Sequence, residues 1–352
     1  MDRIVQEFSP PQDPCRAIQV AENLEDYLLI RPQGPWMIPE TIAYPPSGQE
    51  TGVYWVVDVG GSTVRIAEVD LESQSTSVVV AIALSSAAKQ DIVEFVVLKL
   101  REYGVQGNVA LTWSFPLIDG IIQPMGKGFS SLYVGMDLAS VFNHHLEKAY
   151  AACKVVSVCT DGASALIAQR FLESDCNISL TWGTGININL FMEGVVVNSE
   201  ISMLGREHDR DTFYHLRSAN QYDEVSTFQP LESLVGGLYL ERIAERALGK
   251  PIDFWAVLHD LNHAHFRVVQ AIADRAARIV AGVLTAFLRH TDYYVVAYTG
   301  GVINEPFIRQ TVEYYVQSLG QRIEFVPQVH GSMFGAAVLA AMNEDAARKR
   351  SG

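Results

Sequence analysis

The 352-residue sequence lacks the features that mark several classes of protein. It has four cysteines, Cys15, Cys153, Cys159 and Cys176, without the C-x-x-C spacing of metal sites, which predicts reduced core thiols in a cytoplasmic protein. No cluster of lysine and arginine offsets the net charge of −14, so nucleic acid and anionic membrane surfaces are not expected as partners. No apolar run approaches the roughly 18 residues of a membrane span, and the polar, acidic start of the chain has no signal-peptide pattern.

Two familiar nucleotide-binding motifs are absent as well: G-x-x-x-x-G-K-[ST] and a G-x-G-x-x-G that leads into a helix. The chain has instead the stretch Gly52–Val69, GVYWVVDVGGSTVRIAEV, in which apolar and β-branched residues flank a glycine pair. This pattern predicts a strand, a tight turn and a second strand. The glycines would let backbone N–H groups approach an anion, Ser62 and Thr63 would add hydroxyl donors, and Asp58 could hold a metal-bound water. Alternatively, the glycine pair serves only to form the tight turn of a β-hairpin.

The length predicts about two domains, and an apolar content of 49% is enough for a core in each. The succession of apolar strand, glycine turn, strand and strand occurs twice, near 53–84 and again near 178–198. This recurrence predicts a duplicated β-β-β-α-β-α unit. Strands that alternate with helices, without a long linker or a low-complexity segment, predict an α/β protein whose two lobes face a cleft.

Hydrophobic periodicity predicts the remaining elements. Strands are expected at 77–84, 109–115, 154–158, 178–182, 188–191, 194–198 and 293–298. Helices are expected at 15–30, 91–103, 137–152, 163–171, 231–248, 264–290, 305–319 and 332–349. Residues 204–227 lack strong periodicity and are expected to form a loop.

Asp161 follows the strand expected at 154–158 and precedes an alanine-rich helix. Taken alone, this position favours a role in capping the helix. Asp161 becomes a candidate base if the end of the strand opens into a cleft.

Three further glycine segments have a structural and a functional interpretation. Gly183-Thr184-Gly185 is either a plain hairpin turn or a second phosphate-binding loop with the Thr184 hydroxyl as donor. Gly300-Gly301 and Gly331-Ser332 precede helices, where small residues make an anion or ribose site or simply an entry into the helix. The presence of two strand–turn–strand units in one chain favours the interpretation that these turns bind a nucleotide.

Several polar residues are also open to two interpretations. Ser114 and Lys127 flank an irregular loop, where a lysine beside glycine is commonly a solvated charge. Glu200 ends a strand and Glu232 opens a helix, where a carboxylate favourably meets the helix dipole. Asn187 lies within a strand, where a buried amide needs partners.

Together these stretches resemble the hexokinase family, which includes glucokinase and belongs to the actin-like ATPase superfamily. The resemblance runs from about residue 37 to residue 342. It is carried, in order, by MIPETIAYPPSGQETGVYWVVDVGGSTVRIAEV, LTWSFPLIDG, GKGF, VSVCTDGASALIA, LTWGTGININL, NSEISMLG, PLESLVGGLYLERI, YTGGVI and HGSMFGAAVLAAM. The resemblance implies a two-lobed, ribonuclease H-like α/β fold.

The resemblance also implies roles for the matching residues. Asp161 would be the general base, with Lys127 beside it in catalysis. The phosphates and Mg²⁺ would be bound by Asp58 (to the metal through water), Gly60, Gly61, Ser62, Thr63, Arg65, Gly183, Thr184 and Gly185. The base and ribose of the nucleotide would contact Gly300, Gly301, Gly331 and Ser332. The sugar would contact Ser114, Gly126, Lys127, Thr160, Asp161, Asn187, Glu200 and Glu232.

The sequence departs from the family pattern on the side of the sugar. Thr160 replaces the Asn before the base, Gly162 replaces the Thr after it, Gly126 replaces the Thr before the lysine, and Ile201 replaces a Trp. The loss of an Asn and a Thr removes two hydrogen-bonding groups, each worth about 1–2 kcal/mol. We therefore expect altered acceptor specificity, with the base, the phosphate loops and the two glutamates retained.

The function implied is an ATP- and Mg²⁺-dependent kinase that phosphorylates a hexose or a sugar-like small molecule in carbohydrate metabolism, as in glycolysis. The alternatives are a non-catalytic regulatory protein of the same family and a kinase of a non-sugar alcohol. The implied domains are an N-terminal arm at 1–51, a small lobe with the first phosphate loop at 52–159, a large lobe with Asp161 at 160–328, and a helix returning to the small lobe at 329–352.

Overall fold

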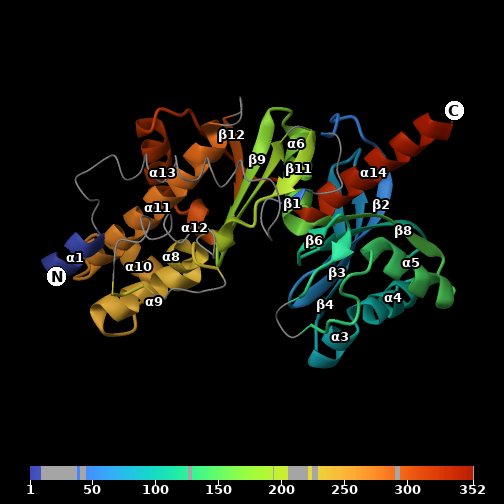
Figure 1. Cartoon of the computed structure of the whole chain (residues 1–352), viewed down its shortest axis with the longest axis horizontal. Coiled ribbons are helices and arrows are strands. Elements are labelled where there is room, and N and C mark those ends of the chain that lie inside the picture. The colour runs from blue at the N-terminus through green and yellow to red at the C-terminus, as the bar shows by residue number, and fades with distance from the viewer. Residues whose placement is uncertain are drawn as a thin grey trace. The chain divides into compact units, whose positions relative to one another are not determined.

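The computed structural model describes residues 1–8, 38–39, 45–125, 129–192, 194–204, 221–223, 229–289 and 294–351 (Figure 1). The chain divides into two compact units. Unit 1 consists of Met1–Met37, Leu180–Ile188 and Ser199–Pro327, and unit 2 of Ile38–Ser179, Asn189–Asn198 and Gln328–Gly352. The helix expected at 15–30 and most of the loop expected at 204–227 lie outside the described residues.

A five-stranded sheet in the order β4-β3-β2-β5-β8 forms the centre of unit 2. Its strands are β2 (Val53–Val59), β3 (Thr63–Asp70), β4 (Ser75–Ala83), β5 (Gly107–Trp113) and β8 (Cys153–Thr160). The first three form an antiparallel meander, and β5 and β8 run parallel to β2. Parallel strands are covered on both faces, which is why β2 and β5 are nearly continuous apolar runs in the sequence.

Helices cover both faces of this sheet. Helices α4 (Ile92–Glu102) and α5 (Leu138–Lys148) share one core with inward side chains of β2, β3 and β5. Helices α6 (Asp161–Leu172) and α14 (Ser332–Ser351) pack on each other, and Figure 1 shows α14 on the opposite face from α4 and α5. The starts of α4 and α5 follow from capping, because the carboxylates of Asp91 and Asp137 accept hydrogen bonds from backbone N–H groups three residues on.

The rest of unit 2 is made of short elements. They are β1 (Ile38–Pro39), α3 (Ser86–Gln90), β6 (Leu117–Ile118), β7 (Ile121–Ile122) and β11 (Val195–Asn198). Strands β9 (Cys176–Trp182) and β10 (Ile186–Met192) cross the boundary between the units within a six-stranded sheet of order β1-β11-β10-β9-β12-β13.

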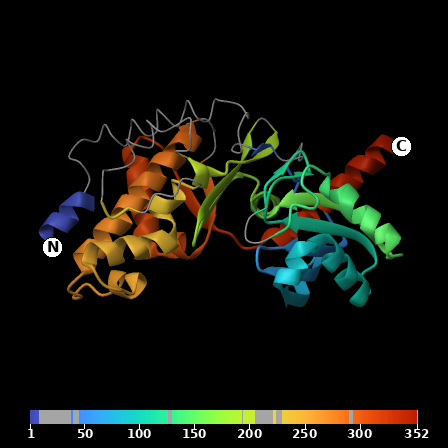
Figure 2. The same ribbon diagram turned by 60° about the horizontal axis from the view of Figure 1, so that its bottom comes forward.

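Unit 1 is mainly helical (Figure 2). Its elements are α1 (Asp2–Phe8), η1 (Ile201–Met203), α8 (Glu232–Val235), α9 (Gly237–Leu248), α10 (Phe254–Leu258), α11 (Phe266–Arg289), β12 (Val295–Thr299), α12 (Gly301–Asn304), α13 (Pro306–Ser318) and β13 (Glu324–Pro327). Helix α11 contacts α1, α8, α9, α10 and α13 and buries most of its side chains. Within this unit the Arg275 guanidinium forms two hydrogen bonds with the Asp223 carboxylate, at 2.8 and 3.0 Å.

The expected elements that fall on described residues are confirmed with small shifts at their ends, apart from three kinds of difference. The helix expected at 231–248 is broken at Gly236, whose backbone is extended. Several short elements were not predicted, because two to seven residues are too few to show periodicity: α1, α3, α10, α12, η1, β1, β6, β7 and β13. The predicted domain boundary at 159–160 also differs from the contact-based division, which keeps residues 160–179 in unit 2. No helix in the described part of the chain is long and apolar enough to cross a membrane.

Helices α6 and α14 approach each other most closely at Gly335. A Cβ atom at this position would collide with the carbonyl oxygen of Ser164. The absence of a side chain therefore sets the distance between the two helices.

Replacement of Gly335 by alanine tests this contact. Helix propensity alone predicts a gain of about 1 kcal/mol in the free energy of unfolding. We expect instead a loss of about 1–3 kcal/mol, because overpacking outweighs propensity. Urea unfolding of Gly335→Ala decides between a gain and a loss of stability. Asn343→Ala, at an exposed position on the same helix, is the control. A more stable Gly335→Ala protein would contradict the contact.

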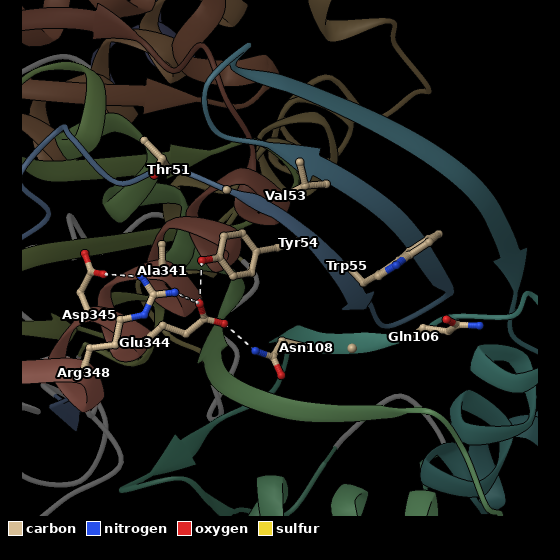
Figure 3. A pocket seen from close by; sticks show the side chains of 12 residues that line it. Thr51, Val53, Tyr54, Trp55, Gln106, Asn108, Ala341, Glu344, Asp345 and Arg348 are labelled. Carbon is tan, nitrogen blue, oxygen red and sulfur yellow. Dashed lines mark hydrogen bonds and ion pairs between the residues drawn. The ribbon is translucent and has the colours of Figure 1, made fainter. Parts of the chain in front are cut away.

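The C-terminal half of α14 is anchored at the start of β2 and β5 (Figure 3). The Glu344 carboxylate accepts hydrogen bonds from the Tyr54 hydroxyl at 3.3 Å and the Asn108 amide at 2.5 Å, and the Arg348 guanidinium lies 3.8 Å away. These side chains line a pocket of about 460 Å³. Burial, together with the charge of Glu344, raises the pKa of Tyr54 to about 12.

This raised pKa predicts a loss of stability in alkaline solution. The Tyr54 phenol loses its proton at a higher pH in the folded than in the unfolded protein. Its contribution to the free energy of unfolding is therefore complete below the ordinary tyrosine pKa of about 10 and is lost as the pH rises through about 12. The difference in free energy of unfolding between wild type and Tyr54→Phe should therefore shrink across this window. Urea unfolding at several pH values measures the difference, and other tyrosines cancel because both proteins contain them. A constant difference would refute the assignment.

Candidate functional site

The first glycine turn lies in unit 2, between β2 and β3. The Gly60 N–H donates to the Thr63 carbonyl at 2.9 Å and closes the turn, and the Ser62 carbonyl accepts from the Leu84 N–H at 2.8 Å. The N–H groups of Gly61 and Ser62 donate no hydrogen bond to any other residue that the structure describes. Two backbone donors at the tip can therefore bind an anion, whereas the Gly60 N–H is already used by the turn.

Asp58 is buried one strand residue before this turn. Its neighbours in the register of the sheet are Arg65 on β3 and Thr112 on β5. The Thr112 hydroxyl donates to Oδ1 at 2.6 Å and the Arg65 guanidinium to Oδ2 at 2.8 Å. Each carboxylate oxygen keeps a second lone pair, so Asp58 can still accept a hydrogen bond from water.

The bond between Thr112 and Asp58 can be tested with two identical substitutions. Thr112→Val removes a donor from a buried carboxylate, and we expect it to lower the free energy of unfolding by about 1.5–3 kcal/mol. Thr285→Val is the matched control, because the buried Thr285 hydroxyl has no partner among the described residues, and it should be neutral or stabilising. Equal urea unfolding curves for the two variants would contradict the role of Thr112.

Asp161 lies at the junction of β8 and α6. The cap of this helix is Thr160, whose hydroxyl oxygen accepts from the Ala163 N–H at 3.4 Å. Asp161 is the first residue of the helix and is exposed; its Oδ1 accepts from the Gly162 N–H at 2.8 Å and its Oδ2 from the Ser114 hydroxyl at 2.7 Å. Ser114 and Asp161 meet because they follow neighbouring parallel strands. The prediction that Asp161 caps the helix is therefore wrong.

The second glycine turn lies in unit 1, at the end of β9. The Gly183 N–H donates to the Gly185 carbonyl at 2.9 Å, and the Gly183 carbonyl accepts from the Gly237 N–H at the start of α9 at 2.8 Å. Gly300 packs on the same turn with a φ of 115°, and a Cβ atom there would collide with the carbonyl of Trp182. Glycine is thus required at 300 both by backbone conformation and by space.

These glycine segments surround a pocket of about 460 Å³ within unit 1. The pocket is lined by Gly183, Thr184, Gly237, Leu238, Glu241, Trp255, Gly301 and Val302. Three of these residues were predicted from the sequence as nucleotide ligands. Trp255 and Glu241 were missed: Trp255 belongs to the unpredicted α10, and Glu241 lies within an amphipathic helix without a distinguishing signal.

Three predicted sugar ligands also belong to unit 1. The Asn187 Oδ1 accepts from the Ile188 N–H at 2.9 Å and the Ser199 hydroxyl at 3.4 Å. Glu200 follows Ser199 in a left-handed conformation, with a φ of 48°. The Glu232 Oε2 accepts from the Ile186 N–H at 3.4 Å and packs against Gly185. The carboxylate of Glu232 therefore lies beside the second glycine turn.

The predicted site residues are divided between the units. Unit 2 contains Asp58, Gly60, Gly61, Ser62, Thr63, Arg65, Ser114, Thr160, Asp161, Gly331 and Ser332. Unit 1 contains Gly183, Thr184, Gly185, Asn187, Glu200, Glu232, Gly300 and Gly301. Gly126 and Lys127 lie outside the described residues. Within the described ranges, no group of three or more His, Cys, Asp or Glu side chains is arranged to hold a metal ion.

The fold matches those of solved sugar kinases. A hexokinase from Schistosoma mansoni complexed with glucose superposes with a TM-score of 0.74 at 18% identity, covering 97% of each chain. A ROK hexokinase from Thermus thermophilus gives a TM-score of 0.58 at 18% identity, covering 84% of this chain and 100% of the other. The protein thus has the two-lobed α/β fold of the actin-like ATPases, as predicted.

Sequence comparisons identify the family. Two family models, both described as Hexokinase, match residues 1–171 and 258–342. N-acetylglucosamine kinase 1 of Candida albicans is 22% identical over 85% of this chain and 84% of its own length. Hexokinase-1 of Arabidopsis thaliana is 23% identical over 75% of this chain and 62% of its own length. The chain belongs to the hexokinase family, as a divergent member.

The family matches extend the resemblance to residue 1, beyond the start near residue 37 that the motifs indicate. Between the two matches lie residues 172–257, which include the second glycine turn, Asn187, Glu200 and Glu232. This segment contains three of the eight residues that were predicted to bind the sugar.

Proposed function

We propose that the protein is a kinase that transfers the γ-phosphate of ATP to a hydroxyl group of a hexose or a sugar-like molecule, with Asp161 as general base. The relatives support sugar phosphotransferase activity in general. The observation that carries the proposal is the environment of Asp161, which is exposed, does not cap its helix and is oriented by Ser114. A carboxylate so held can accept a proton from an alcohol.

In this proposal Asp161 aligns the acceptor hydroxyl and takes its proton. Phosphoryl transfer passes through a loose transition state, so positioning and charge stabilisation supply most of the catalysis. The Ser114 hydroxyl bonds one carboxylate oxygen and the Gly162 N–H the other, which restricts rotation of the carboxylate. Lys127 would add positive charge near the transferred group.

The two glycine turns would bind the phosphates. In unit 2 the free N–H groups of Gly61 and Ser62, the hydroxyl groups of Ser62 and Thr63, and Arg65 offer donors. In unit 1 the exposed Thr184 hydroxyl does the same. The remaining lone pairs of Asp58 fit the hydration shell of Mg²⁺, which keeps several waters when bound and would neutralise phosphate charge.

The nucleotide base and ribose would occupy the pocket of unit 1. Trp255 and Leu238 offer apolar surface for a base, and the Glu241 carboxylate can accept ribose hydroxyl donors. Gly301 borders the same space, and Gly300 packs on the neighbouring turn at Gly183. Gly331 and Ser332, at the start of α14 in unit 2, would contribute the contacts with base and ribose that the sequence predicts.

The acceptor would be held by carboxylates and amides, which pair with hydroxyl groups and reject apolar analogues. Asn187, Glu200, Glu232 and Ser114 are the proposed ligands, together with the Thr160 and Gly126 positions at which the chain departs from the family. The 22% identical relative, an N-acetylglucosamine kinase, makes amino sugars part of the candidate range. A non-sugar alcohol acceptor or a regulatory protein without turnover is the alternative, and a cytoplasmic location stays a prediction.

ATP consumption across glucose, other hexoses, N-acetylated amino sugars and polyols tests the proposal. We expect turnover of at least one acceptor, and a fall in kcat of about 10²–10⁴-fold in Asp161→Asn with an unchanged KM for ATP, since only the proton acceptor is lost. Asp345→Asn, the same change on the exposed surface of α14, is the control. Bound nucleotide without turnover of any acceptor would favour the regulatory alternative. Full activity of Asp161→Asn would refute the assignment of Asp161 as the general base.

A further inference from the structure

Asn189 on β10 has an unusual environment. Its side chain is completely buried, and neither the Nδ2 nor the Oδ1 atom has a hydrogen-bond partner among the described residues. A buried primary amide left unpaired lowers stability, because it has lost its hydrogen bonds to water.

The amide faces the first turn of α6, and both segments belong to unit 2. A Cβ atom on Gly162 would collide with the Asn189 Nδ2 and would lie 3.1 Å from Cγ and Oδ1. Asn189 therefore packs directly against the α-carbon of Gly162 and occupies the space that a side chain at 162 would need. The two residues are mutually dependent, since a larger residue at 162 requires a smaller one at 189.

Gly162 is also the residue that fixes Asp161. Its N–H donates to the Asp161 Oδ1 at 2.8 Å, while Ser114 holds Oδ2. A side chain that determines where the Gly162 backbone lies thus determines where this donor points.

We propose that Asn189 is a positioning residue for Asp161, acting through Gly162. The proposal rests on the proposed kinase activity for its effect on turnover, but its effect on α6 can be measured without it.

Asn189→Ala removes the side chain that packs against Gly162. We expect at least a tenfold fall in kcat with an unchanged KM for ATP, and faster amide hydrogen exchange in residues 160–166. Asn189→Leu should restore most of the lost kcat, because leucine has nearly the same shape as asparagine, and its Tm should exceed that of wild type by about 2–4 °C, because it needs no hydrogen bonds. Thr285→Val is the control, with a neutral or raised Tm, unchanged kcat and unchanged exchange at α6.

The pairing with Gly162 provides a second test. Gly162→Ala should be less stable than wild type because of the collision, and adding Asn189→Ala should restore much of the lost Tm. If the effects of the two substitutions on Tm are additive, the inferred contact between Gly162 and Asn189 is wrong. If Asn189→Ala does not fold, Asn189→Ser takes its place in the kinetic and exchange measurements.

The two proposals fail in different ways. Absence of turnover by the wild-type protein on every acceptor refutes the kinase activity, and the exchange measurement then still decides about Asn189. Wild-type kcat together with unchanged exchange in Asn189→Ala overturns the positioning role and leaves the kinase proposal intact. Faster exchange together with a reduced kcat supports both.

Discussion

The first turn of helix α6 is the constraint on which most of unit 2 depends. Thr160 caps it, Ser114 and the Gly162 N–H orient the carboxylate of Asp161, and the Ser164 carbonyl meets Gly335 of α14. The same few residues therefore end a strand, start a helix, set the distance between two helices and present a carboxylate to solvent. Small residues at 162 and 335 make this possible, because each leaves room for a neighbouring backbone or side chain.

The two glycine turns reach similar geometry by different means. In unit 2 the register of the sheet aligns Arg65, Asp58 and Thr112 across three strands, so the charge beside the turn is fixed by strand pairing. In unit 1 the turn is held by backbone contacts with Gly237 and Gly300, and the Glu232 carboxylate packs beside it. The first turn depends on side-chain pairing across the sheet, and the second mainly on the close approach of chain segments.

Much of this was predictable from sequence, for reasons that are local. The hairpin at Gly52–Val69 is recognisable because its alternating residues and glycine pair are neighbours in the chain, and the order of motifs identified the family and fold correctly. Whether Thr160 or Asp161 caps α6 could not be decided, because both residue types cap helices and only backbone geometry separates them. Trp255 and Asn189 could not be found, since their significance lies in neighbours that are distant in sequence.

Unit 2 is assembled from three separate parts of the chain, and its last part contains α14. This arrangement has a consequence for folding during synthesis. The sheet of β2, β5 and β8 and the helix α6 are made early, but the helix that covers them follows only after Ser199–Pro327 has been translated. Until then α6 is the only one of these two helices that covers that face of the sheet. Apolar surface left exposed in this way makes an incomplete chain prone to aggregation.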